Sequence, residues 1–231
     1  MSSPTITPEL LRSFPLFQTV PASELVELTS EARFFSINRR GVIYQIGDSS
    51  EFIYFLFEGR LQGVDFTLDG REVGLFFVEP KEYCGELALF DPGPQSETVI
   101  ATVKSMILAI PLEEFRRFLY KHPAIISDTT ARIAKRVRAL TNQRTLLAIP
   151  DIPQRVCAQL VSLTEADPHR RITNPPTHQE LGIMLNTSRE TVTRVFQRLQ
   201  NLNIVKREGT TSLEILDLEQ LKAIASGEIR L

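Results

Sequence analysis

The sequence has little of what defines disulfide-rich or membrane proteins. Its 231 residues include two cysteines, Cys84 and Cys157, and two cysteines cannot build a disulfide framework, so a reducing cytoplasm is the natural compartment. There is no run of about 18 apolar residues and no N-terminal stretch in which an apolar run follows a basic start. We therefore expect a cytoplasmic protein that does not engage a membrane.

Histidine is equally scarce, which bears on catalysis and on metals. The three histidines are His122, His169 and His178, so none occurs in the first 121 residues. A metal enzyme of the cupin type, which also uses a β-roll, needs two or three histidines and a carboxylate on adjacent strands. We therefore predict no enzyme and no metal site.

The chain also has no large excess of positive or negative charge. The formal net charge is -2 at pH 7, so any surface for nucleic acid must be local. Between residues 169 and 207 basic residues outnumber Glu180 and Glu190. The basic residues are Arg170, Arg171, Arg189, Arg194, Arg198, Lys206 and Arg207. A chain of this length favours two domains, and a basic surface is expected in the second.

The first half reads as β structure. After two short helical patterns within residues 1–30, hydrophobic residues alternate with polar ones from Arg33 to Ile110, and turn residues recur. Asp69-Gly70 is the strongest hairpin signal in the chain. We predict an α+β protein whose residues 1–122 form an antiparallel β-roll with flanking helices, serving as a sensor domain.

A single long helix is predicted after this domain, from Ala124 to Leu147, within a segment of residues 123–149. A narrow apolar stripe repeats along it, which is typical of a two-helix dimer seam; an ordinary core helix is the alternative. The seam residues are Ile126, Thr130, Ile133, Val137, Leu140 and Leu147. The arginines between them, Arg132 and Arg136 included, are expected to face solvent. Pro150 and Pro153 end the helix, so a hinge is predicted there.

Residues 150–231 predict a winged helix-turn-helix. Thr177 and Glu180 form a capping box for one short helix, and Ser188 can cap a second. In the second helix apolar residues share one side, while Arg189, Glu190 and Arg194 lie largely elsewhere. Arginine can bond guanine and glutamate can accept from cytosine in a major groove. A hairpin signal around Gly209 then predicts the wing.

Residues 188–194, Ser-Arg-Glu-Thr-Val-Thr-Arg, resemble the recognition helix of the CRP/FNR superfamily of bacterial transcription regulators, and the resemblance extends over nearly the whole chain. It implies a homodimer on double-stranded DNA, with RNA polymerase as a partner if the protein activates transcription. Base contacts are expected from Arg189, Glu190, Thr193 and Arg194, and phosphate contacts from Thr177, His178 and Ser188. Palindromes with TGTGA-like half-sites follow by resemblance, although Thr193 stands where the cyclic-AMP receptor branch has glycine.

The resemblance also places an altered effector pocket in the sensor domain. Residues 85–90, from Gly85, Glu86 and Leu87 onward, resemble the phosphate-binding cassette of cyclic-nucleotide-binding domains. Cyclic-AMP binders place an arginine eleven residues after the glycine and then a serine, whereas this chain has Ser96 and Glu97, followed by Thr98. A carboxylate repels a phosphate. Leu140 and Thr141 stand where hydroxyl residues face the base. Cyclic AMP is therefore not the expected effector. Glu86 stands where the cassette's glutamate takes the ribose hydroxyl, but a turn-stabilising role is expected for it instead.

The sequence also lacks the residues that two other sensor types of the superfamily use. Its iron–sulfur members carry a cluster of N-terminal cysteines, but no cysteine precedes Cys84 in this chain. Its haem members usually use a histidine of the sensor domain as a ligand, and His122, beside Pro123, is the only histidine near that domain. We therefore predict no cofactor. The alternatives that stay open are a cyclic-nucleotide response, redox sensing through Cys84, an unknown small effector, or a module that acts on a protein partner without DNA.

Overall fold

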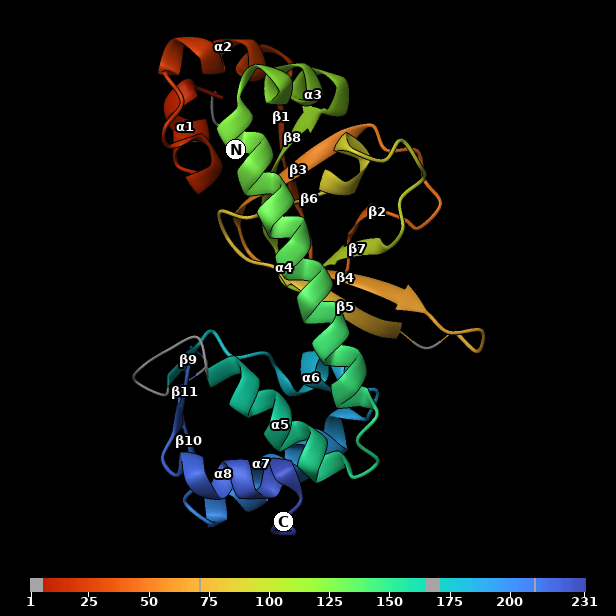
Figure 1. The fold of residues 1–231 in the computed structure, drawn as a ribbon, viewed down its shortest axis with the longest axis vertical. Coiled ribbons are helices and arrows are strands. Elements are labelled where there is room, and N and C mark those ends of the chain that lie inside the picture. The colour runs from red at the N-terminus through yellow and green to blue at the C-terminus, as the bar shows by residue number, and fades with distance from the viewer. Residues whose placement is uncertain (1–5, 71, 165–170, 210) are drawn as a thin grey trace. The chain divides into compact units, whose positions relative to one another are not determined.

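The computed structural model describes residues 6–70, 72–164, 171–209 and 211–231, and they form two compact units. The first unit holds the described residues of 1–71 and 75–138, and the second holds 72–74 and the described residues from 139 onward. Figure 1 shows the course of the chain through both units. In the described ranges no helix is long and apolar enough to cross a membrane.

Two four-stranded antiparallel sheets form the β-roll of the first unit. One sheet has the order β1-β8-β3-β6 and the other β2-β7-β4-β5. Their bounds are β1 Arg33–Ile37, β2 Val42–Tyr44, β3 Phe52–Glu58, β4 Leu61–Phe66, β5 Glu72–Val78, β6 Tyr83–Cys84, β7 Thr98–Ala101 and β8 Ser105–Pro111. The predicted hairpin lies between β4 and β5, where Gly70 has φ +78°, a conformation that glycine adopts without strain. The predicted α+β class and β-roll are confirmed.

Helices cover the roll at one end and enclose an aromatic core. They are α1 Pro8–Arg12, η1 Pro15–Phe17, α2 Ala22–Glu31 and α3 Leu112–Lys121, and a short 3-10 helix, η2 Glu86–Leu89, follows β6. Phe14, Phe17 and Phe55 are buried together with Phe115 and Phe118. Ring centroids 5.3 Å apart for Phe14 and Phe55 place these side chains in edge-to-face contact, the arrangement that aromatic quadrupoles favour.

Helix α4 spans Pro123–Leu147 and so begins one residue before the predicted start at Ala124. Its first half packs on the roll. Ile125 and Thr129 are the buried residues of this helix. Arg132 and Arg136 follow at helical spacing on the same side, with side chains 25% and 15% exposed. The prediction that these two arginines face solvent is therefore wrong. Buried carboxylates and carbonyls in the roll supply the partners that solvent was expected to supply.

The predicted seam residues of α4 lie on another side of the helix. Ile126, Ile133 and Leu147 are half-buried, and Thr130 is exposed. Val137 is 57% exposed and Leu140 37% exposed. Of the stripe, Ile126 packs against the core of the first unit, whereas Val137 and Leu140 lie on the surface.

The second unit contains the predicted winged helix-turn-helix. Its elements are α5 Ile152–Thr164, β9 Arg171–Thr173, α6 His178–Met184, α7 Arg189–Asn201, β10 Val205–Glu208, β11 Ser212–Ile215 and α8 Leu218–Ser226. The wing has three strands in the order β10-β11-β9 rather than the two predicted, because the short β9 pairs its Ile172 with Leu213. Arg170 and His169 lie outside the described residues.

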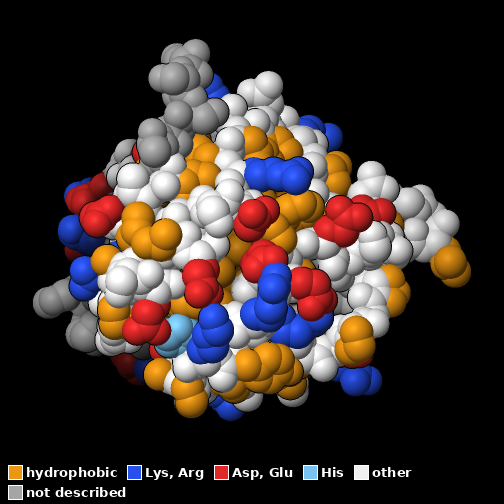
Figure 2. Space-filling view, turned by 90° about the horizontal axis from the view of Figure 1, so that it is seen from above, with side chains coloured by type: hydrophobic (Ala, Val, Ile, Leu, Met, Phe, Trp, Pro, Cys, Tyr) orange, Lys and Arg blue, Asp and Glu red, His pale blue; other side chains and the backbone are white. Residues whose placement is uncertain are grey.

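Surface charge on the first unit is mixed. Figure 2 shows the face at the α2 and α3 end, where basic and acidic side chains lie beside one another among hydrophobic ones. Lys121 Nζ lies 2.9 Å from Glu27 Oε2, and Arg117 pairs with Glu114. Because opposite charges alternate here, this face offers no single-sign field for a polyanion.

Candidate DNA-binding surface and effector pocket

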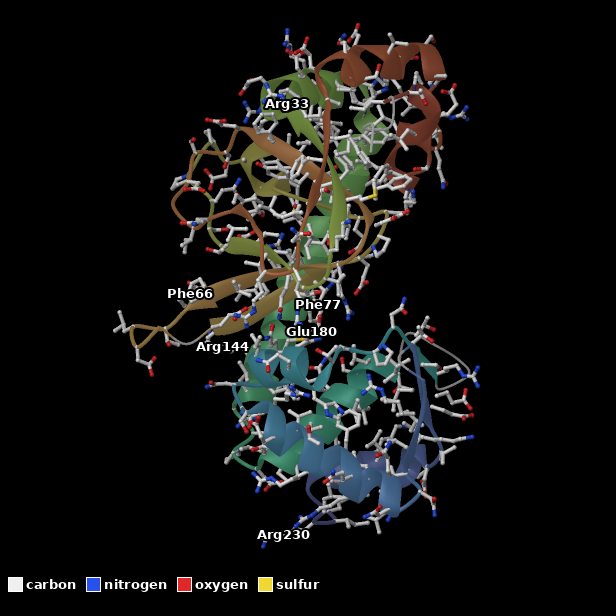
Figure 3. All side chains as sticks on the ribbon, turned by 180° about the vertical axis from the view of Figure 1, so that it is seen from behind. Arg33, Phe66, Phe77, Arg144, Glu180 and Arg230 are labelled. Carbon is white, nitrogen blue, oxygen red and sulfur yellow. The ribbon has the colours of Figure 1, made fainter. Side chains whose placement is uncertain are left out.

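The turn between α6 and α7 is built from local hydrogen bonds. Thr177 Oγ1 accepts from the Glu180 amide at 3.2 Å, and Glu180 accepts from the Thr177 amide at 2.7 Å, so the predicted capping box is present. Figure 3 labels Glu180 in the first turn of α6. Ser188 Oγ accepts from the Thr191 amide at 3.1 Å, which caps α7. Both helix starts therefore have the side chains that satisfy their free amides.

A buried glycine sets how closely α6 approaches the start of α7. A Cβ built on Gly182 would lie 2.9 Å from the Thr187 carbonyl oxygen and 3.3 Å from the Arg189 amide. The Thr187 amide donates to the Gly182 carbonyl at 2.9 Å. Two backbones meet here without room for a side chain, and this contact fixes the angle at which α7 leaves the turn.

Helix α7 has one buried face and one exposed edge. Val192, Val195, Phe196 and Leu199 are buried in the core of the second unit. Arg189, Glu190 and Arg194 are exposed, and Thr193 is half-buried between them. The packed face holds the helix rigid, so the two arginines and the carboxylate form a fixed pattern of donors and acceptors. Such a pattern is what direct reading of base edges requires.

His178 connects this edge to the wing. Its Nδ1 lies 2.9 Å from Thr193 Oγ1, and its Nε2 lies 3.4 Å from an Arg207 nitrogen. Thr193 Oγ1 donates to the Arg189 carbonyl at 2.9 Å, so the ring proton belongs on Nδ1 and Nε2 accepts from Arg207. Burial, followed by the nearby Arg207 and Arg189, lowers the pKa of His178 below its ordinary 6.5. The ring is therefore neutral at neutral pH.

The predicted pocket residues of the first unit divide between buried and exposed positions. Gly85 is buried with φ +88°, Glu86 is 0% exposed and Glu97 is 4% exposed. Thr98 is buried and accepts from the Ile46 amide at 3.1 Å, while Leu87 and Ser96 are exposed. Leu140 and Thr141 are exposed residues of the α4 segment that belongs to the second unit. The structure thus brings Glu86 and Glu97 into one interior cluster.

Arg136 of α4 lies between these two carboxylates. Its Nη1 lies 3.0 Å from Glu86 Oε1, and its Nη2 lies 2.8 Å from Glu97 Oε1. The guanidinium carbon lies 3.2 Å from the centroid of the Phe76 ring, in the stacked position that arginine favours. Glu86 is therefore an ion-pair partner of α4 rather than the turn-stabilising carboxylate that the sequence favours.

Further groups surround the cluster. Tyr44 Oη donates to Glu97 Oε1 at 3.2 Å, and Ser96 Oγ donates to Glu97 Oε2. Arg132 binds Glu82 at 3.0 Å, and its Nε lies 4.0 Å from Glu86 Oε1. Burial raises the pKa of Tyr44 above its ordinary value, so the phenol keeps its proton. Removing one member of a buried ion pair costs about 3–5 kcal/mol because the other charge is left without a partner, so each charged group of this cluster depends on the others.

The surroundings of Ser96 and Glu97 differ from those expected of a phosphate-binding site. The position of the expected phosphate-binding arginine is Ser96, which is exposed and bonded to Glu97. The carboxylate of Glu97 is buried within the cluster and bonded to Arg136. A phosphate placed beside Glu97 would meet a like charge in a desolvated site.

The two cysteines are buried and free. Burial, followed by the nearby Glu86, raises the pKa of Cys84, and burial raises the pKa of Cys157 to about 12. The thiolate is the reactive form of cysteine, so neither side chain has the exposure or the charge state of a redox sensor. Within the described residues there is no group of three or more potential metal ligands of the His, Cys, Asp or Glu type.

The sequence predictions do not include Tyr44 and Phe76 in this cluster, and they place Arg136 in solvent. A signal for Arg136 was available, because Ile125, Thr129, Arg132 and Arg136 recur at intervals of four, three and four residues. That spacing marks a second helix face beside the apolar stripe. Tyr44 and Phe76 lie on strands whose alternation marks them only as ordinary core positions.

Comparisons with known proteins cover both units. Residues 34–122 match the family model of the cyclic nucleotide-binding domain, and residues 154–224 match that of the Crp-like helix-turn-helix domain. The CRP-like cAMP-activated global transcriptional regulator of Mycobacterium tuberculosis is 27% identical over 218 residues, which cover 92% of this chain and 97% of the relative. The cyclic AMP receptor protein of Thermus thermophilus is 28% identical over 220 residues, covering 94% and 99%.

Solved structures agree at the level of the fold. A CooA mutant from Carboxydothermus hydrogenoformans superposes with a TM-score of 0.75 at 17% identity and covers 97% of this chain and 98% of its own. At such low identity the likeness concerns the fold alone.

Proposed function

Since the chain belongs to the CRP/FNR superfamily of bacterial transcription regulators, we propose that it is a homodimer that reads a palindromic DNA site with α7. The observation that carries this proposal is the exposed edge of Arg189, Glu190 and Arg194 on a helix whose opposite face is buried. The protein acts by binding and not by catalysis. RNA polymerase is its further partner where it activates transcription.

We assign the arginines to guanines and Glu190 to a cytosine, since these are the pairings that side-chain geometry favours in the major groove. Thr193 makes a lesser contact, to a base or a thymine methyl group. We assign phosphate contacts to Thr177, His178 and Ser188, because they lie at helix starts, where the helix dipole favours an anion. Half-sites similar to TGTGA are expected, at a spacing of one DNA turn, roughly 34–36 Å, across the two-fold axis.

The named relatives are cAMP-activated or cyclic AMP receptor proteins, but we propose that this chain does not use cyclic AMP. The reason is that Ser96 stands where the phosphate-binding arginine is expected, and that the next residue, Glu97, is a buried carboxylate. A regulator with this pocket binds DNA without a cyclic nucleotide, or responds to a different small molecule.

Fluorescence anisotropy with a labelled TGTGA palindrome tests both parts of the proposal. We expect tight binding without ligand, weaker binding at higher salt, and no change on adding cyclic AMP. A duplex of the same composition with scrambled half-sites is the control for sequence-independent binding. Binding that required cyclic AMP would overturn the effector assignment, and equal affinity for both duplexes would overturn the half-site.

A further inference from the structure

The cluster at Glu86 and Glu97 has the chemistry of a cation site rather than of an anion site. Both carboxylates are almost fully buried, and the ring of Phe76 provides an aromatic face beside them. Two carboxylates and one aromatic face complement a planar guanidinium, which donates in a fork and stacks on rings. Arg136 already supplies such a group from α4.

We propose that this interior site of the β-roll is a guanidinium-binding site that the protein fills with its own Arg136. Glu86 and Glu97 are the anionic partners that bind Arg136 of α4. The first half of α4 is therefore held on the roll without any bound effector. For regulation this means effector-independent DNA binding, a consequence that rests on the proposed function; the binding site itself does not.

One atom of the cluster shows that the internal guanidinium does not use all the acceptors. Glu86 Oε2 is buried and makes no hydrogen bond, although Glu86 Oε1 accepts from Arg136. A buried carboxylate oxygen without a donor is costly. A free guanidinium compound has five N–H donors and no tether to a helix, so it can satisfy both carboxylates when the Arg136 side chain is removed.

The test is chemical rescue in the full-length protein. Arg136→Ala removes the internal guanidinium and leaves Glu86, Glu97 and Phe76 in place. We expect a lower thermal unfolding midpoint, which ethylguanidinium at millimolar concentration raises again in this variant. Ethylammonium, which lacks the planar fork, is the matched control ligand and is expected to give a smaller rise. Wild-type protein, whose site is filled, is expected not to respond.

Rescue that also occurs in wild-type protein, or that is equal for the two cations, would overturn the proposal. A second measurement covers the case in which Arg136→Ala does not fold. This measurement is a double-mutant cycle of Glu97→Gln and Arg136→Met, followed by the thermal unfolding midpoint. Arg136→Met should lower the midpoint less in the Glu97→Gln background than in wild type, because residue 97 then carries no charge to repel Glu86. Shifts that simply add, or a double variant no more stable than Arg136→Met, would contradict the pairing.

These readouts are independent of DNA. A wild-type protein that fails to bind the palindrome would overturn the proposed function while leaving the rescue intact. Failure of the rescue with DNA binding preserved would overturn only the guanidinium site.

Discussion

At the scale of single residues, Gly182 determines whether the two helices of the DNA-binding unit can meet. We predict that Gly182→Ala lowers the stability of the second unit by about 1–3 kcal/mol, the usual cost of forcing extra volume into a packed site. The added Cβ would lie 2.9 Å from the Thr187 carbonyl oxygen, which is backbone and cannot turn aside. Urea unfolding monitored by circular dichroism measures the loss.

Gly93→Ala is the control for this substitution. A Cβ at Gly93 meets only Asp91 Oδ1, at 3.9 Å, so we expect it to leave the unfolding curve unchanged. Equal stability of the two variants would show that the α6–α7 approach has more room than its geometry indicates.

His178 gives a second prediction at this scale, in the pH dependence of stability. Its pKa is lowered in the folded protein below the ordinary 6.5, so the unfolded chain takes up a proton at a higher pH than the folded one. The contribution of neutral His178 is therefore complete above that ordinary value and is lost as the pH falls below it. We predict that His178→Asn, which keeps a donor near Thr193, removes this part of the acid destabilisation.

The measurement is the difference in unfolding midpoint between wild type and variant, followed from about pH 8 to about pH 5. Using the difference removes the contribution of carboxylates that titrate in both proteins. Parallel curves over this range would show that His178 titrates equally in the folded and unfolded chains.

At the scale of elements, α4 has two faces with different tasks. One face packs on the roll through Ile125 and Thr129, and the other presents Val137 and Leu140 to solvent. We predict that Val137→Glu converts a dimer into a monomer, because a charge in the centre of a helix seam has no partner. The stability of the single chain should change little, since Val137 is 57% exposed.

Sedimentation of the full chain measures this change. Asn142→Glu adds the same charge at an exposed position of the same helix and should leave the assembly intact. A dimer that survives Val137→Glu would place the interface on another surface.

Helix α4 also shows which part of the fold a sequence can predict. Its bounds, and the caps Thr177 and Ser188, depend on neighbours within a few residues, so local patterns suffice. The inward course of Arg136 depends on Glu86 and Glu97, which come from distant segments. Periodicity along one helix cannot reveal such partners, and an arginine without them is correctly expected in solvent. The same reasoning applies to β9, whose three residues become a strand only by pairing with β11.

At the scale of the whole molecule, a net charge of -2 must be reconciled with binding to a polyanion. The surface at the α2 and α3 end has mixed charge (Figure 2), whereas the second unit presents Arg189 and Arg194 on one exposed edge. Long-range attraction by the whole protein is therefore weak. Affinity for DNA must therefore come from local contacts. Loss of a single base-reading arginine should remove a large share of the total binding free energy.

We predict that Arg189→Ala weakens binding to the palindrome by about 1–3 kcal/mol and relaxes preference for the guanine it reads. Lys222→Ala, on α8, removes an exposed charge 3.7 Å from Glu219 and should leave affinity unchanged. Anisotropy titrations against the palindrome and against single-base variants separate the two effects. If Arg189→Ala lowered affinity equally for every duplex, its partner would be a phosphate, and base reading would rest with Glu190 and Arg194.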